Sequence, residues 1–318
     1  MDPHFPSLLL SFLISLRGLR STSLSPSGAL TAFLFGYLTL ALPLRVFGVT
    51  LLGFYFAGSK VTKLKHSIKA TYEELDKSQQ GGGKRNWCQV VCNAAVSMVC
   101  AVAWRWWFSG EFTGERGWQD EGKWCIVAAN RGEYGVRESS SRALVLIAIA
   151  FSSACCGDTF ASELGILSTS SPILITRPFS GPVPRGTNGG ITLWGLFVSI
   201  LGGVWVGLLA ITTLLLQGQG KTCEEGWWIE VMGVAAFAGL GGSLLDSLLG
   251  ALFQPTYYSP SRKLVIPNHS SSKKRTGLKD VVRVKGTAVL GNWLSNNGVN
   301  FLMGLFTSGI AGVYAVRA

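Results

Sequence analysis

Apolar segments long enough to cross a bilayer recur along the whole chain, and they limit what it can fold into. A helix needs about 20 mostly apolar residues to span the hydrocarbon core. Only 14% of the 318 residues are charged and 48% are hydrophobic, whereas soluble domains carry roughly 25% charged residues. The sequence therefore predicts an all-α, polytopic helical membrane protein with about seven spanning helices. The expected spans are 29–42, 46–58, 89–107, 143–166, 191–216, 229–253 and 286–315.

The charges of the loops predict how these spans are oriented. Cytoplasmic loops of membrane proteins carry an excess of Lys and Arg. Loops 59–88 and 254–285 show this excess, whereas loops 108–142 and 217–228 do not. With seven spans the two classes of loop alternate, so the amino terminus and loop 166–190 are also expected in the cytoplasm.

One membrane-embedded helical domain, 28–318, is expected to follow an amino-terminal arm, 1–27. The apolar run of the arm, 8–16, is short for a span. The arm is rich in Ser and nearly free of acids, which is compatible with a targeting segment; an arm on the membrane surface or a disordered arm is the alternative. We expect the endoplasmic reticulum membrane, with an organelle envelope as the alternative.

Composition argues against several other classes of protein. The net charge of +11 could indicate nucleic-acid binding, but the cations flank the spans, where they meet anionic lipid headgroups. Membrane lipids are therefore the expected partners, and nucleic acid is not. The seven cysteines form no CxxC pair and the three histidines are scattered, so neither a zinc site nor a disulfide framework is indicated. Cys125 and Cys223, in loops assigned to the same side, could still pair.

An acidic cluster lies at the end of the fourth predicted span. If the helix continues, Asp158, Ser162 and Gly165 share one face, and Thr159 and Glu163 share a neighbouring face. Ionisable residues at this depth are costly and usually face a polar cavity or a partner. The pattern therefore predicts polar surroundings for both acids.

Two interpretations of the acidic cluster remain open. One is a carboxylate site for a divalent cation, because Mg²⁺ takes one or two carboxylates together with phosphate oxygens. The other is a structural ion pair in which Asp158 or Glu163 binds Arg177 or Arg185.

A basic, glycine-rich loop precedes the fifth predicted span. Successive backbone N–H groups in such a turn, in front of a helix, can form an anion-binding concavity, and arginines add phosphate contacts. The spacing is not that of a Walker loop, and a tight turn that re-enters the membrane is the alternative. The candidate anion-binding residues are Arg177, Arg185, Gly186, Thr187, Asn188, Gly189 and Gly190.

A weak internal repeat adds a third acid. Asp246-Ser247 repeats Asp158-Thr159 at the same position relative to the predicted cytoplasmic face, and repeats often meet at a shared site in membrane proteins. Asp246 is therefore a candidate catalytic residue and, with Asp158, a candidate metal ligand. A polar contact between helices is the alternative.

Asparagines form a stripe near the start of the last predicted span. Asn292, Asn296 and Asn300 follow i, i+4, i+8 spacing, which places them on one helical face. They are candidates for binding a substrate, although hydrogen bonds between helices would explain them equally well. Asn93 and Lys60 are lesser candidates.

These motifs resemble the transmembrane protein 19 family of integral membrane proteins. That family includes a plant phytyl-phosphate kinase and is distantly similar to CTP-dependent polyprenol and dolichol kinases. The resemblance implies that Asp158 is a metal-associated acid and that Arg185–Gly190 binds nucleotide phosphate. Segment 111–140 matches nothing in the family. The matching segments cover most of residues 28–301 and are GALTAFLFGY, FYFAGSKVTKLK, GDTFASELGILS, LITRPFSGPVPRGTNGGIT, GGSLLDSLLGALFQ and NNGVNF.

The resemblance implies a membrane-bound kinase. It would transfer a phosphoryl group from a nucleoside triphosphate, CTP, to an isoprenoid monophosphate of prenyl or phytyl type, with Mg²⁺ as cofactor. Asp158, Glu163, Asp246 and Arg185 are the expected catalytic residues. The alternatives are a proton- or cation-coupled transporter that uses the intramembrane acids, and a non-catalytic membrane regulator.

Overall fold

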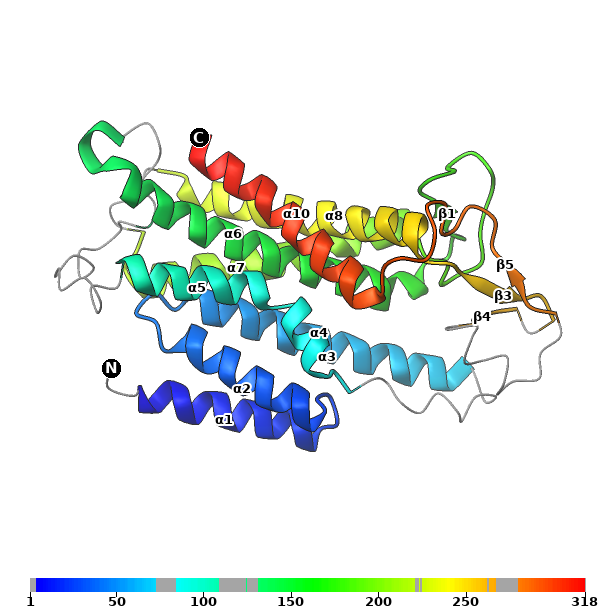
Figure 1. Ribbon diagram of the computed structural model, residues 1–318, viewed down its shortest axis with the longest axis horizontal. Coiled ribbons are helices and arrows are strands. Elements are labelled where there is room, and N and C mark those ends of the chain that lie inside the picture. Colours follow the sequence, from blue (N-terminus) through cyan, green and yellow to red (C-terminus); the bar gives the residue numbers. More distant parts are fainter. Residues whose placement is uncertain are drawn as a thin grey trace.

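The computed structural model describes residues 4–72, 84–108, 124, 131–220, 223, 225–261, 263–266 and 280–317. The described chain is mainly helical, as predicted, and its long helices lie side by side (Figure 1). Its α-helices are α1 (Phe5–Arg20), α2 (Pro26–Leu40), α3 (Val46–Tyr72), α4 (Trp87–Cys92), α5 (Ala95–Phe108), α6 (Arg131–Leu164), α7 (Leu193–Leu216), α8 (Trp227–Phe253) and α10 (Asn296–Arg317).

Helix α6 is the centre of the bundle. It packs against α3, α5, α7, α8 and α10, and the stretch from Val145 to Gly157 is almost wholly buried. Small residues such as Ala148, Ser152 and Ala154 dominate this stretch, which lets several helices approach one another closely. Both acids of the predicted cluster therefore lie at the end of the most enclosed helix.

Four helical segments in the described part of the chain are long and apolar enough to cross a membrane. The predicted spans 143–166, 191–216 and 229–253 match three of them closely, and the last predicted span corresponds to Asn296–Arg317. The other predicted spans fall on helices that are shorter or more polar. The chain is thus a polytopic helical membrane protein.

Residues at the surface and between the helices follow the pattern of a membrane protein. On α1 the side chains that face the bundle are small, Ser7, Ser11 and Ser15, whereas Phe5 and Phe12 on the other face are exposed. In water this distribution would be unfavourable, but in lipid it places apolar groups against acyl chains and small residues at the helix contact.

Two helices differ from their predicted bounds for local reasons. The third predicted span is broken between α4 and α5, where the Asn93 side chain donates to the carbonyl of Gln89 at 2.8 Å. The last helix begins at Asn296 rather than at residue 286, because Ser295 caps it: its hydroxyl accepts from the N–H of Gly298 at 3.2 Å. Polar caps thus set both boundaries.

The amino-terminal arm is helical. Helix α1 packs along α2 in the opposite direction, so the described chain begins at the same end of the bundle as the carboxyl terminus (Figure 1). The expectation of a cytoplasmic amino terminus took 29–42 as the first element, and α1 adds one more reversal before it.

Short strands gather at the opposite end of the bundle, the end that the sequence predicts to face the cytoplasm (Figure 1). One antiparallel pair consists of β1 (Ile173–Leu174) and β2 (Gly190–Ile191). A second sheet has the order β4-β3-β5 and contains β3 (Tyr257–Ser259), β4 (Leu264–Ile266) and β5 (Val282–Arg283). Cys125, one half of the suggested cysteine pair, lies outside the described residues, as do most of segment 111–140 and the middle of loops 59–88 and 254–285.

Candidate functional site

A cavity of about 1430 Å³ opens at the end of the bundle that carries the strands. Its polar chamber is formed by α6, α8, the start of α10 and the loop before α7, and a mostly apolar arm continues between α2 and α3. The predicted residues that line it are Asp158, Glu163, Asp246, Arg185, Gly186, Thr187, Asn188, Gly189, Gly190, Asn296 and Asn300.

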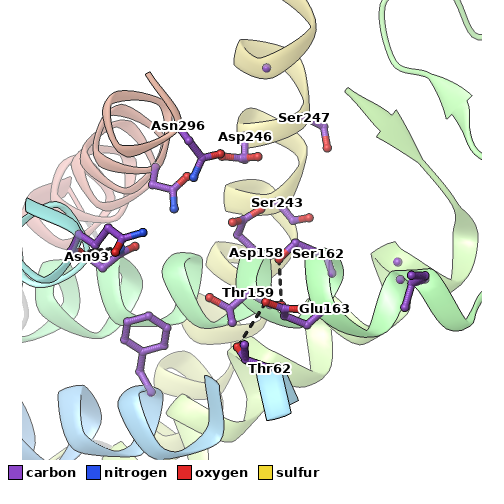
Figure 2. Close-up of a pocket in the computed structure, with 18 of the residues that line it drawn as sticks. Thr62, Asn93, Asp158, Thr159, Ser162, Glu163, Ser243, Asp246, Ser247 and Asn296 are labelled. Atoms are coloured by element: carbon purple, nitrogen blue, oxygen red, sulfur yellow. Dashed lines mark hydrogen bonds between the residues drawn. The ribbon is translucent and has the colours of Figure 1, made fainter. Parts of the chain in front are cut away.

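Asp158 on α6 and Asp246 on α8 meet in the chamber. Figure 2 shows both side chains directed into the same space, and their carboxyl groups are close enough to interact electrostatically. When the Asn300 amide is oriented to satisfy its neighbours, its nitrogen donates to Asp246 Oδ1 at 3.3 Å and to the carbonyl of Asn296 at 2.9 Å. Two acids so close favour a shared proton or a bound cation over two bare negative charges.

Close backbone packing sets the spacing of this pair. A Cβ atom on Gly157 would lie 2.5 Å from the carbonyl oxygen of Gly239, and one on Gly202 would lie 2.8 Å from the Gly157 Cα. Helices α6, α7 and α8 therefore touch through glycine at the level of the acids. This contact holds Asp158 and Asp246 on helices whose separation is fixed.

Glu163 lies one turn beyond Asp158, toward α3. Its Oε1 accepts a hydrogen bond from Thr62 at 3.3 Å (Figure 2). Among the described residues neither Arg177 nor Arg185 pairs with Asp158, because Arg185 donates to Thr169 and Arg177 lies beside Gly286.

The glycine-rich loop packs against the end of α8. Gly189 has φ +82°, and a Cβ atom there would lie 2.4 Å from Ala251. Three backbone N–H groups of the loop donate hydrogen bonds within the protein. That of Thr187 donates to the carbonyl of Pro184 at 3.2 Å, that of Gly190 to the carbonyl of Thr187 at 2.9 Å, and that of Asn188 to the hydroxyl of Thr256 at 3.0 Å. The predicted concavity of successive free amides is therefore not formed by these three, because the tight turn uses them for its own structure.

The two arginines predicted to flank this loop are separated. Arg185 lines the cavity and donates to the carbonyl of Thr169 at 3.3 Å. Arg177 instead lies over Gly286 beside a small surface cavity that it shares with Arg283 and Lys285. Pairing of β1 with β2 turns Arg177 away from the chamber, so only Arg185 can reach a ligand there.

The asparagine stripe is divided in the same way. Asn296 and Asn300 line the chamber, whereas Asn292 precedes the capped helix and is exposed. Asn93 lines the cavity because the helix breaks at that residue. Lys60 is not among the described residues that line it.

Two lining cations were not predicted, Arg85 and Lys263. Arg85 is half-buried between α3 and α6, and burial lowers the pKa of its guanidinium while Tyr55 and Glu163 act in the opposite direction. Lys263 reaches the cavity from the β3–β4 turn. Both residues lie in basic loops, where their individual positions give no signal in the sequence.

The lining suits a hard cation that arrives with a phosphate. The atoms near Asp158 and Asp246 that could bind a cation are oxygens of carboxylates, hydroxyls and amides, including those of Ser243 and Asn296 (Figure 2). The described residues contain no cluster of three or more His, Cys, Asp or Glu. Because Mg²⁺ binds through one or two carboxylates plus substrate oxygens, the residues present fit a shared rather than an all-protein site.

Comparisons with known proteins agree with this architecture. The family described as Integral membrane protein DUF92 matches residues 9–308. The chain is 32% identical to Protein PGR of Arabidopsis thaliana over 311 residues, which cover 98% of this chain and 95% of that protein. It is 43% identical over 97 residues to an uncharacterized membrane protein of Methanocaldococcus jannaschii, covering 30% of this chain and 35% of the other. No solved structure matches significantly.

Proposed function

We propose that this chain, which belongs to the DUF92 family of integral membrane proteins, transfers a phosphoryl group to a lipid phosphate. The donor is a nucleoside triphosphate, CTP by the resemblance of the motifs to lipid kinases. The acceptor is an isoprenoid monophosphate of prenyl or phytyl type. The reaction takes place at the strand-bearing end of the bundle, in the membrane of the endoplasmic reticulum or of an organelle envelope.

The observation that carries the proposal is the convergence of acids and cations in one cavity. Asp158 and Asp246 come from different helices, and Arg185 comes from a loop, yet all three line the same chamber. Arg85 and Lys263 add positive charge around the acids. A site for polyphosphate and a divalent cation requires this combination, because each negative oxygen needs an opposing charge.

The transfer itself needs no general base. An ionised oxygen of the acceptor phosphate attacks the γ-phosphorus and forms a new P–O bond. The bond from the γ-phosphorus to the β–γ bridging oxygen breaks, and the nucleoside diphosphate leaves with that oxygen. Catalysis then consists of positioning and charge neutralisation.

The residues of the chamber divide these tasks. Arg185 and Lys263 neutralise donor phosphates at the open end, and Asp158 and Asp246 hold Mg²⁺, which when bound offsets charge on the phosphate oxygens. Asn300 fixes the orientation of Asp246 through its hydrogen bond. Glu163 lies near Arg85 and helps to position that guanidinium.

A direct assay tests the proposal. The purified full-length protein in lipid nanodiscs is given CTP, Mg²⁺ and labelled phytyl or geranylgeranyl phosphate, and the diphosphate product is measured. We expect product that depends on CTP and is lost in Asp246→Asn. A folded sample that forms no diphosphate from any prenyl phosphate or nucleoside triphosphate would contradict it.

The same preparation distinguishes the transporter alternative. A proton- or cation-coupled carrier would give nucleotide-independent flux in liposomes that Asp158→Asn abolishes. Between Asp158 and the far end, α6 presents the buried apolar and small residues of 143–157. This dry stretch favours a reaction at one membrane face over passage through the bundle.

A further inference from the structure

We infer that the apolar arm of the cavity binds the isoprenoid tail of the acceptor, that Arg85 at its mouth holds the acceptor's phosphate, and that the α1–α2 hairpin sets the tail length accepted. This inference rests on the proposed function, since it assigns the acceptor subsite of that reaction. It also gives the amino-terminal helices a role in substrate binding rather than in targeting.

The arm is an apolar extension of the polar chamber. Its α2 wall carries Ala32, Gly36 and Thr39 at i, i+4 and i+7, which lie on one helical face. Its α3 wall carries Leu52 and Gly48. A cavity that is polar at one end and apolar at the other suits an amphipathic ligand with a charged head group and a hydrocarbon tail.

Arg85 is placed at the junction by the turn between α1 and α2. The Arg85 N–H donates to the carbonyl of Ser23, and the Ser25 N–H donates to the carbonyl of Arg85, both at 3.0 Å. These backbone bonds fix the chain on either side of the guanidinium. The acceptor phosphate and the hairpin are therefore mechanically linked through one residue.

The guanidinium itself reaches across α3. It lies 5.9 Å from the centre of the Tyr55 ring, and its Nη1 donates to Ser59 at 3.4 Å. A Cβ atom on Gly58 would approach its Nη2 to 3.2 Å, so the missing side chain leaves room for it. An arginine held in place and half-buried is well suited to binding a phosphate, because its fork is already ordered.

The depth of the arm gives the length scale. From Gly58, beside Arg85, to Gly48 at the far end is ten residues of α3, or about 15 Å along a helix. Tails that are shorter leave part of the arm unfilled, and longer tails must bend or emerge into lipid. Affinity should thus rise with each isoprene unit until the arm is full and then level off.

The test measures binding and turnover across a series of tail lengths. Geranyl, farnesyl, geranylgeranyl and longer prenyl phosphates are titrated against the full-length protein, with the matching prenyl alcohols as phosphate-free probes. Ala32→Phe fills the arm near its mouth, and Thr39→Phe fills it about 10 Å deeper. Leu34→Phe is the matched control, because Leu34 faces outward from the same helix. Thermal unfolding reports whether each variant is folded.

We expect Ala32→Phe, near the mouth, to weaken geranyl and geranylgeranyl phosphate alike by at least tenfold, and Thr39→Phe, deeper in the arm, to spare geranyl phosphate and affect only the longest tails. Arg85→Gln should weaken all phosphates about tenfold and leave the alcohols unchanged. If wild-type affinity does not depend on tail length, or if Ala32→Phe matches Leu34→Phe, the inference is wrong even with kinase activity intact. Length-dependent binding without turnover would instead refute the kinase and retain the lipid subsite.

Discussion

Two charged pairs join the same two helices, α6 and α8, and they are built in opposite ways. Arg142 and Glu230 form an ion pair near one end, and Asp158 and Asp246 meet near the other. On α6, Asp158 follows Arg142 by sixteen positions, and on α8, Asp246 follows Glu230 by the same number. The two pairs are therefore about 24 Å apart along the helices. We call the end with the cavity, near Asp158 and Asp246, the open end, and the end with the Arg142–Glu230 ion pair the closed end. The comparison shows how the two ends differ.

The pair at the closed end is satisfied by the protein alone. Arg142 donates to Glu230 and, at 2.7 Å, to the carbonyl of Ala315, and it lies 6.0 Å from the centre of the Tyr314 ring. One guanidinium thus connects α6, α8 and α10. The pair at the open end has like charges and faces a cavity, so it needs a proton or a cation that the chain does not supply. We infer that the first pair stabilises the fold and the second binds a ligand.

The largest expected effect separates these roles. Asp158→Asn removes a charge that the cation and phosphates require, and it also relieves repulsion with Asp246. We expect phosphoryl transfer to fall at least about 100-fold, with an unchanged or higher unfolding temperature. Product formation and thermal unfolding, measured on one sample, check this. Retention of more than a tenth of the activity would place the chemistry elsewhere.

The closed pair should respond in the reverse manner. Arg142→Met leaves Glu230 as an uncompensated, partly buried charge, and we expect a loss of about 3 kcal/mol in the free energy of unfolding. Activity per folded molecule should persist. The control is the double variant Arg142→Met, Glu230→Met, which removes both charges and should recover most of the stability. Equal damage in the single and double variants would mean that packing, not charge, holds this end.

The glycine contact between the two pairs can be tested by adding one methyl group. Gly157→Ala would press against the backbone of Gly239 and force α6 and α8 apart. We expect a loss of about 1–3 kcal/mol together with reduced activity, because the spacing of the acids changes. Gly233→Ala is the control, since a Cβ atom there meets nothing within 4 Å. Unfolding and turnover of both variants decide the matter.

The smallest effect concerns two exposed arginines of one loop region. Arg185 lines the chamber and Arg177 does not, so Arg185→Ala should raise the KM for nucleotide about tenfold, the value of one charged hydrogen bond. Arg177→Ala should change it less than twofold. Steady-state kinetics at varied CTP concentration compare them. Equal effects would indicate that overall positive charge matters more than position.

Periodicity and motif chemistry predicted much of the chamber. Asp158, Asp246 and the Arg185–Gly190 loop were singled out from local patterns, and all line one cavity. Arg85 was not singled out, because its importance depends on backbone pairing with Ser23 and Ser25 about 60 residues earlier. The prediction that Arg177 lines the site was wrong for the same reason, because the direction of its side chain depends on the pairing of β1 with β2.

The sequence by itself determined the membrane-embedded helical class, the main apolar spans and the polar residues that had to face something other than lipid, because burial of charge in hydrocarbon is costly wherever it occurs. Only the tertiary structure decided which of those residues meet. Glycine contacts between α6, α7 and α8 bring two acids together. The α1–α2 turn holds Arg85 near Glu163, and the Ser295 cap starts the last helix after Asn292, which separates Asn292 from Asn296 and Asn300. These contacts join residues far apart in the chain, and no local pattern encodes their distances.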